Sequence, residues 1–308
     1  MSTVNLSPEQ FEQVSMDEKA ADSITRPPIG YWQDAWIRFK KNRLALLGLA
    51  VLSVMIFMAI IGPFIGGWDY RVMDYKTGTN ALPSGEHWFG TDYLGRDMFV
   101  RLWTGTRISV FIGVVAAALD LIIGVTFGGI SGYFGGTVDD VMMRIVDVLV
   151  GVPYLLTVIL LLVVMRPGLT SIILAMVITG WTGMGRLVRG QVLQLKEMEY
   201  VLAAKSIGAS PRRIIARHLI PNTMGVVLIS LTMTIPAAIF TEAFLSFIGL
   251  GVPMPMASLG TLANEGYQVL YVHPHNMIIP AITISLLILS FNFVGDGLRD
   301  ALDPRLRQ

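Results

Sequence analysis

Six apolar stretches constrain the fold of this chain more than any other feature. The hydrocarbon core of a bilayer, roughly 30 Å thick, needs about 20 apolar residues in helical conformation to cross it. The stretches cover about residues 44–65, 108–130, 146–165, 169–185, 223–247 and 277–294. Only 15% of the residues are charged, whereas a soluble domain normally carries about 25%. The mean hydropathy is +0.62. We therefore predict an all-α polytopic membrane protein with six transmembrane helices.

The distribution of Lys and Arg predicts the orientation of these helices. With six spans, both termini and the loops at 131–145 and 186–222 share one side, which holds 17 of the 23 cations. The opposite side, with the long segments 66–107 and 248–276, holds the remaining 6. The positive-inside rule then places both termini in the cytoplasm.

The chain divides into three predicted regions. Residues 1–43 form a cytoplasmic region, 44–107 hold the first span and an outer loop, and 108–308 form the core. Residues 1–30 are too polar to bury a core, which predicts a loose tail without the apolar centre of a signal peptide. Aromatic residues and cations alternate in 31–43, which is typical of an interfacial amphipathic helix. The alternative is a simple flank of the first span.

A polar segment at residues 199–222 separates the fourth and fifth apolar stretches. It begins with an alanine-containing helix that ends at Gly208, since glycine readily adopts the left-handed conformation of a helix C-terminus. Ser210 and Pro211 predict the N-cap and first residue of a second helix, which Pro221 stops. A basic helix-turn-helix held between two spans favours docking onto a protein outside the membrane. The alternatives are packing alone, or attraction of its cations to anionic lipid.

The polar segment resembles the cytoplasmic coupling loop of bacterial ABC importer permeases, with the pattern E-A-A-x3-G-x9-I-x-L-P. Ala203, Ala204, Gly208 and Pro221 match that pattern, while Leu202 replaces Glu and His218 replaces Ile. Four further motifs resemble the C-type permease of dipeptide, oligopeptide and nickel importers, most closely an oligopeptide permease. They are Phe89-Gly90-Thr91-Asp92 with Gly95-Arg96-Asp97, Gly132-Tyr133-Phe134-Gly135-Gly136, Leu245-Ser246-Phe247-Ile248-Gly249-Leu250-Gly251 and Asp300-Ala301-Leu302-Asp303-Pro304-Arg305.

This resemblance implies a pore subunit of the bacterial cytoplasmic membrane rather than an enzyme. Its implied partners are a homologous B-type permease, two ABC ATPase subunits, an extracytoplasmic peptide-binding protein and membrane lipid, but no nucleic acid. ATP and Mg would belong to the ATPases, and no cofactor to this chain, which has no P-loop G-x4-G-K-[ST] sequence. The resemblance assigns ATPase coupling to Glu199, Tyr200, Leu202, Ala203, Ala204, Lys205, Gly208, Ala209, Arg212, Arg213 and Pro221. It implies di- or oligopeptide substrates, with nickel and glutathione as alternatives.

Ionisable and amide residues inside the predicted spans are candidates for the translocation pathway or its gate. Asp120 lies near the middle of span two, where it either lines a path or forms a helix–helix hydrogen bond. Asp147 is three residues after Arg144, which predicts a local ion pair. Glu242 is expected at an outer gate or cavity wall, or extending to the interface. Asn292 is expected to pair with nearby polar residues of span six.

The outer stretch from Leu94 to Trp103 has an amphipathic pattern. We expect an interfacial helix there, with Arg96, Asp97 and Arg101 on its polar face and an ion pair between Asp97 and Arg101.

Two rival functions are open at this stage. An ion-coupled secondary transporter requires ionisable groups at the bilayer midplane, and Asp120 alone meets this condition. A membrane hydrolase is suggested by Gly129-Ile130-Ser131-Gly132, but a serine nucleophile needs a nearby base, and the four histidines lie in predicted loops.

Overall fold

The computed structural model describes residues 30–166 and 168–302, and the regular structure in these residues is helical apart from two isolated β-bridges. Five helical units are long and apolar enough to cross a membrane, and a bent pair makes a sixth if it counts as one span. The five are α3 (Arg43–Ile65), α4 (Met98–Phe134), α7 with α8 (Leu169–Gly180 and Thr182–Leu195), the unit Pro211–Leu250, and α13 (His275–Leu302). The prediction of an all-α polytopic fold is confirmed. Residues 1–29 of the predicted loose tail lie outside the described residues.

The bent pair replaces the single helix predicted at 146–165. Helices α5 (Gly136–Gly151) and α6 (Tyr154–Val164) meet at an angle of 80°. Val152 and Pro153 between them are not helical, because proline lacks a backbone donor and disfavours the helical conformation of the residue before it. The prediction of one straight span was wrong because it followed hydropathy and passed over this proline.

Helix α4 begins ten residues earlier than predicted and absorbs the expected interfacial helix. Asp97 is its N-cap and accepts a hydrogen bond of 2.8 Å from the backbone of Val100. The predicted polar face is buried, with Arg101 only 1% exposed. The predicted ion pair between Asp97 and Arg101 is absent from the described residues, since Arg101 pairs with other carboxylates.

Glycine allows α4 and α8 to pack backbone against backbone. Gly124, Gly128 and Gly132 recur every four residues along one face of α4. A Cβ atom on Gly128 would lie 2.3 Å from the carbonyl oxygen of Gly185 in α8. Small residues at this spacing are a common means of close helix association in membranes. The sequence analysis did not identify this repeat.

A proline in α3 is supported from α4. Pro63 has no N–H, so the Ala59 carbonyl four residues earlier lacks its helical donor. Arg107 of α4 supplies the replacement, because its Nε and Nη2 atoms donate to the carbonyls of Ala59 and Ile60, each at 2.9 Å.

The second helix of the polar segment does not stop at Pro221. Helix α10 (Pro211–Ile214), the π-helix η2 (Ile215–Leu219), α11 (Ile220–Leu245) and the π-helix η3 (Ser246–Leu250) form one unit from Pro211 to Leu250. Pro221 occupies the first turn of α11, and the wider π-turn precedes it. Proline has no backbone N–H, so it needs no acceptor four residues earlier. The wider π-turn before it accommodates its ring. The predicted end of this helix was therefore wrong.

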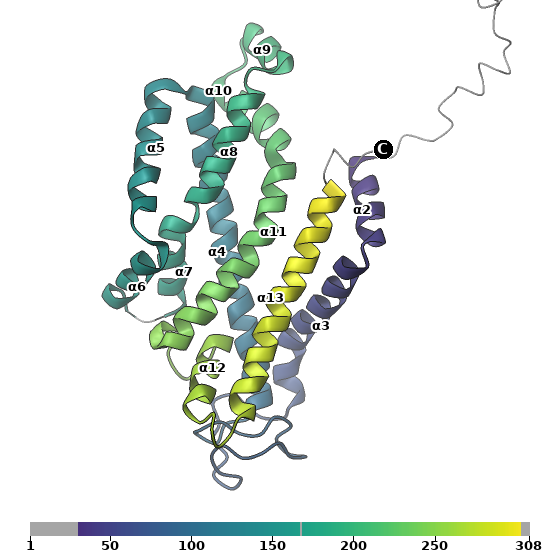
Figure 1. Ribbon diagram of the computed structural model, residues 1–308, viewed down its shortest axis with the longest axis vertical. Helices are drawn as coiled ribbons and strands as arrows, with labels where there is room; N and C mark the ends of the chain where they lie inside the picture. Colours follow the sequence, from purple (N-terminus) through teal and green to yellow (C-terminus); the bar gives the residue numbers. More distant parts are fainter. Residues whose placement is uncertain (1–29, 167, 303–308) are drawn as a thin grey trace, which may run out of the picture.

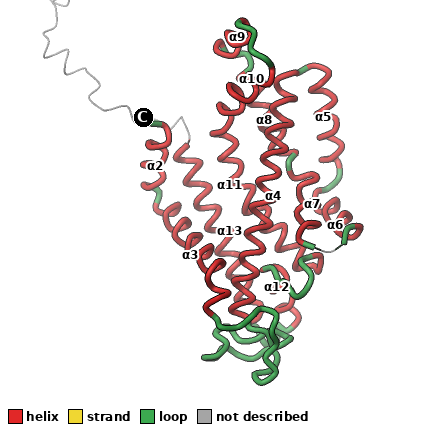
Figure 2. Tube along the Cα trace, turned by 180° about the vertical axis from the view of Figure 1, so that it is seen from behind, coloured by secondary structure: helices red, strands yellow, loops and turns green. Residues whose placement is uncertain are grey.

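The helices place the loops at two opposite ends (Figure 1). Helix α9 (Glu199–Ser206) and α10 lie at one end, together with α2 (Tyr31–Lys41) and the last turns of α13. The loop between α3 and α4 lies at the other end, near α12 (Leu259–Gln268), as Figure 2 also shows. Helix α2 is separate from α3 and packs on α13 through Phe39. These positions agree with the expectation that the polar segment and both terminal regions share one side.

Candidate functional site

The polar segment forms a tight, fully hydrogen-bonded turn between α9 and α10. Gly208 has a φ of +80°. Its N–H donates to the Lys205 carbonyl at 3.0 Å, and the Ala209 N–H donates to the Ala204 carbonyl at 3.0 Å. This pair of hydrogen bonds is a Schellman motif, which satisfies the last carbonyls of a helix. Ser210 occupies the N-cap position as predicted, but its side chain makes no capping hydrogen bond.

One face of the polar segment is anchored in the helix bundle. Val201 and Ile214 are completely buried, and Ala204 is nearly so. They share a hydrophobic cluster with Val188 and Val192 of α8. Buried contacts therefore join α9 and α10 to α8, so the polar segment is packed onto the bundle as one unit.

The other face of the polar segment is exposed. Ile207 is 86% exposed, and Tyr200 and Leu202 are about 40% exposed. Of the eleven residues predicted to couple to an ATPase, nine are exposed, Ala209 is half-buried and Ala204 is buried. The exposed nine are Glu199, Tyr200, Leu202, Ala203, Lys205, Gly208, Arg212, Arg213 and Pro221. The exposed face combines apolar side chains with cations, which is a surface suited to a protein partner.

A cavity of about 370 Å³ lies among α4, α5, α6, α7, α8 and α11. Asp120 of α4 is 8% exposed and lines it, and no described residue donates a hydrogen bond to its carboxylate. The predicted helix–helix hydrogen bond is therefore wrong within the described chain, whereas the cavity-lining alternative agrees with the structure. The complete lining is Asp120, Leu149, Val150, Val152, Tyr154, Met176, Thr179, Gly180, Thr182, Thr234, Ala237, Ala238 and Thr241.

Four threonines of this lining were not among the predicted pathway residues. Thr179, Thr182, Thr234 and Thr241 come from α7, α8 and α11. Thr234 and Thr241 are seven residues apart, so they share one face of α11. That spacing of hydroxyls within an apolar stretch was a visible signal, but it does not reveal which face meets Asp120.

Glu242 lies close to the cavity in sequence but is not part of its lining. It is completely buried and accepts hydrogen bonds from Ser109 at 2.6 Å and Ser246 at 2.7 Å. Ser109 in turn accepts from the backbone N–H of Leu259, the first residue of α12. Glu242 therefore joins α4, α11 and the start of α12. It does not form a wall of this cavity, and because it is completely buried the alternative that it extends to the interface is wrong.

The remaining pathway candidates have other surroundings. Asp147 pairs with Arg186 of α8 at 2.8 Å, not with Arg144, and both side chains are exposed. The side chain of Asn292 is half-buried and forms no hydrogen bond with a described residue. The predicted pairing with neighbouring polar residues in span six is wrong, because Asp296 and Arg299 form no ion pair in the described part of α13.

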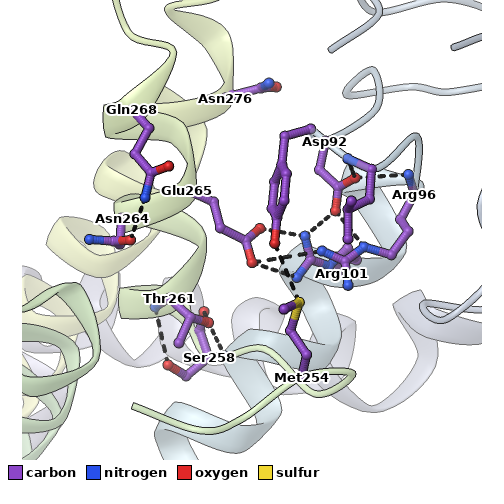
Figure 3. Close-up of polar contacts among 12 residues, drawn as sticks. Asp92, Arg96, Arg101, Met254, Ser258, Thr261, Asn264, Glu265, Gln268 and Asn276 are labelled. Atoms are coloured by element: carbon purple, nitrogen blue, oxygen red, sulfur yellow. Dashed lines mark hydrogen bonds and ion pairs between the residues drawn. The ribbon is translucent and has the colours of Figure 1, made fainter. Parts of the chain in front are cut away.

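An ionic network holds the outer loop onto the helices (Figure 3). Arg101 of α4 binds Glu265 of α12 at 2.6 Å and also contacts Asp92 of the loop. Asp92 accepts a further bond of 2.7 Å from Arg96. Buried charges are stable only when paired and hydrogen-bonded, so this network fixes the loop, α4 and α12 together. No local pattern indicates Glu265 as a partner, because it is 164 positions from Arg101.

A second buried contact in this loop centres on His87. Its ring nitrogens lie 2.8 Å from Asp97 and 3.2 Å from Asp74, and its ring packs on Trp68. Burial alone lowers the pKa of His87, but the two carboxylates outweigh burial and the net pKa is raised. Hydrogen bonds from Thr77 and Lys76, with His87 as a further partner, hold the pKa of Asp74 well below its usual range.

Comparison with known protein families gives two matches. Residues 124–308 match the model described as the binding-protein-dependent transport system inner membrane component. Residues 30–83 match the N-terminal TM domain of oligopeptide transport permease C.

Two relatives and one solved structure extend these matches. The chain is 53% identical to the dipeptide transport system permease protein DppC of Bacillus subtilis (strain 168), over 98% of this chain and 97% of the relative. It is 51% identical to the oligopeptide transport system permease protein OppC of the same organism, over 99% of each. An inward-facing structure of the MetNI methionine ABC transporter matches 67% of this chain and 98% of its own with a TM-score of 0.54 and 19% identity. The last likeness shows the permease fold.

Proposed function

Because the chain belongs to the family of inner membrane components of binding-protein-dependent transport systems, we propose that it forms half of the translocation pathway of an ATP-driven peptide importer. The similarity over nearly the whole chain to two peptide permeases carries this proposal. The two relatives are named for dipeptides and oligopeptides and are almost equally similar. The proposal therefore extends to peptides as a class and leaves peptide length open. Glutathione and nickel are the alternative substrates in this reading.

The cavity beside Asp120 is the part of the pathway that this chain would supply. A homologous B-type permease would provide the opposite wall. An extracytoplasmic binding protein would deliver the peptide at the end formed by α12 and the outer loop, where the ionic network around Arg101 keeps the receiving surface rigid.

ATP-driven movement would enter through the polar segment. Two ATPase subunits would bind the exposed faces of this segment and its counterpart on the partner permease, with ATP and Mg held by the ATPases. The concentration of Lys and Arg at the α9 end supports a cytoplasmic position for that end and for both termini. Because one face of the polar segment is packed on α8, closure of the ATPases would move α8 and α11 and change access to the cavity.

Co-purification tests this proposal, with a charge placed on the exposed face. Ala203 is exposed on α9, so Ala203→Asp leaves the core intact while introducing a carboxylate at the docking surface. We expect the wild-type chain to co-purify with a second permease and two ATPases, and the variant to lose ATPase. Tyr271→Asp is the matched control, because Tyr271 is 100% exposed near α12 at the opposite end. Purification of the wild-type chain alone or as a homo-oligomer would contradict the proposal.

The rival secondary transporter gives a different energetic signature. An ATP-driven importer loses uptake when ATP is depleted and retains it when an uncoupler collapses the proton gradient while ATP is maintained. The opposite pattern would assign Asp120 to ion coupling.

A further inference from the structure

The carboxylate of Asp120 accepts no hydrogen bond and forms no ion pair in the described part of the protein, and it lies in a cavity of about 370 Å³. We infer that Asp120 and the surrounding threonines form a subsite for a primary ammonium group of the transported molecule. The N-terminus of a peptide supplies this group, and so does a lysine side chain. This inference rests on the proposed peptide import, and it adds the chemical group that this half of the pathway recognises.

Burial is the first argument for a cationic ligand. An isolated carboxylate in an apolar region is costly unless it is paired or hydrogen-bonded. Asp120 is 8% exposed, and the residues that line its cavity include no Lys, Arg or His. A positively charged group that enters the cavity would therefore meet a carboxylate whose charge no cation of the lining neutralises.

The orientation of the threonine hydroxyls is the second argument. Thr182 donates its proton to the Thr179 carbonyl at 2.8 Å, Thr234 donates to Ser230 at 3.0 Å, and Thr241 donates to Ala237 at 2.9 Å. A hydroxyl group has one proton to donate and two lone pairs. Since Thr182, Thr234 and Thr241 use their protons within their own helices, their oxygens remain available as acceptors, whereas the Thr179 hydroxyl has no hydrogen bond in the described part of the chain. An ammonium group offers three donors and no acceptor, so it complements the Asp120 carboxylate and these three oxygens.

The fit of Gly180 against Asp120 is the third argument. A Cβ atom at Gly180 would lie 2.5 Å from Oδ2 and 2.9 Å from Oδ1 of Asp120. Glycine therefore leaves the carboxylate room beside α7. A methyl group there displaces the carboxylate without changing its charge, which provides a test that does not remove Asp120.

The test compares uptake of matched peptides by the complete importer in proteoliposomes with its binding protein. The probes are trialanine and propionyl-Ala-Ala, which differ only in the amino group. For each permease we divide the initial rate for trialanine by that for propionyl-Ala-Ala. Selectivity of the binding protein enters every ratio equally, so comparison of the wild-type and Asp120→Asn ratios isolates the contribution of the permease. We expect the ratio to fall at least about tenfold in Asp120→Asn, as for loss of a buried charge-assisted hydrogen bond.

Co-purification with the other subunits shows whether Asp120→Asn assembles. If it does not, further variants still test the inference. Gly180→Ala is expected to lower the ratio as well, while Gly183→Ala, with no atom within 4 Å of the added carbon, leaves it unchanged. A third probe, propionyl-Ala-Lys, tests the lysine side chain as the source of the ammonium group. If the ratio of the amine probe to the propionyl probe is the same in wild type and in the variants, for the N-terminal amine and for the lysine side chain alike, the inference is overturned. Absence of ATP-dependent trialanine uptake by the wild-type complex would instead contradict the proposed function.

Discussion

Replacement of Gly208 is the sharpest test of the turn in the polar segment. The residue has a φ of +80°, yet an added Cβ atom would meet nothing within 4 Å. The cost of a side chain is therefore conformational and not steric. The left-handed conformation costs an L-residue roughly 1–2 kcal/mol, and more for a β-branched residue such as valine. Gly208→Ala should thus open the turn more often, and Gly208→Val more often still.

Amide hydrogen exchange measures this opening directly. A cost of about 1–2 kcal/mol corresponds to a change of roughly 5- to 30-fold in an equilibrium between two states. The amides of Gly208 and Ala209 close the turn, so the Ala209 amide in Gly208→Ala should exchange faster by that factor. Gly208→Asn should show a smaller change, because asparagine tolerates the left-handed conformation.

The functional consequence is a loss of coupling without a loss of insertion. Uptake per ATP hydrolysed should be highest in wild type and fall progressively in Gly208→Asn, Gly208→Ala and Gly208→Val. The amount of chain in the membrane should stay constant. Gly190→Ala is the control, because this glycine also faces open space but has no positive φ. Unchanged exchange at Ala209 in Gly208→Val, or an equal effect in the control, would refute the reasoning.

Three other perturbations follow from contacts in the helices and the outer loop. Arg107→Gln should lower stability by roughly 1–3 kcal/mol, because the carbonyls beside Pro63 lose their donor; thermal unfolding in detergent checks this, with Arg107→Lys expected to be intermediate. The raised pKa of His87 means that its protonated form stabilises the outer loop fully below its unfolded pKa of about 6.5. That contribution is lost as the pH rises through the higher folded value. The protection factors of the loop amides, which correct for the intrinsic pH dependence of exchange, should therefore fall with rising pH in wild type and lose this dependence in His87→Gln. Gly128→Val should cost roughly 1–3 kcal/mol by forcing α4 from α8, whereas Gly129→Ala, whose nearest contact is at 3.6 Å, should be tolerated in the same melting assay.

Hydropathy and local sequence predicted the features that depend on neighbouring residues. The apolar stretches became helices, and Gly208 adopted the left-handed turn. The error at Pro153 came from following hydropathy past a helix-breaking residue, so a local rule was sufficient to avoid it. The error at Pro221 shows the limit of local rules, because this proline occupies the first turn of α11 after a π-turn that no local pattern indicates.

The pairing of charges was beyond local reasoning. Asp147 and Arg186 are 39 positions apart, and Arg101 and Glu265 are 164 apart. The sequence identified Asp120 and Glu242 as unusual residues within apolar stretches, yet only the helix arrangement separates their surroundings. One carboxylate is satisfied by Ser109 and Ser246, while the other faces a cavity.

The long helical unit from Pro211 to Leu250 has a mechanical consequence. Its 40 residues, with a kink at Gly249 near the end, correspond to about 60 Å at 1.5 Å per residue, twice the hydrocarbon thickness. Pro236 lies 25 residues from the docking end, so a tilt of about 10° pivoting there would displace that end by roughly 6–7 Å. The same tilt would move Thr241, only five residues beyond the pivot, by about 1 Å. A large displacement at the ATPase-binding end would thus produce only a small displacement at the cavity wall.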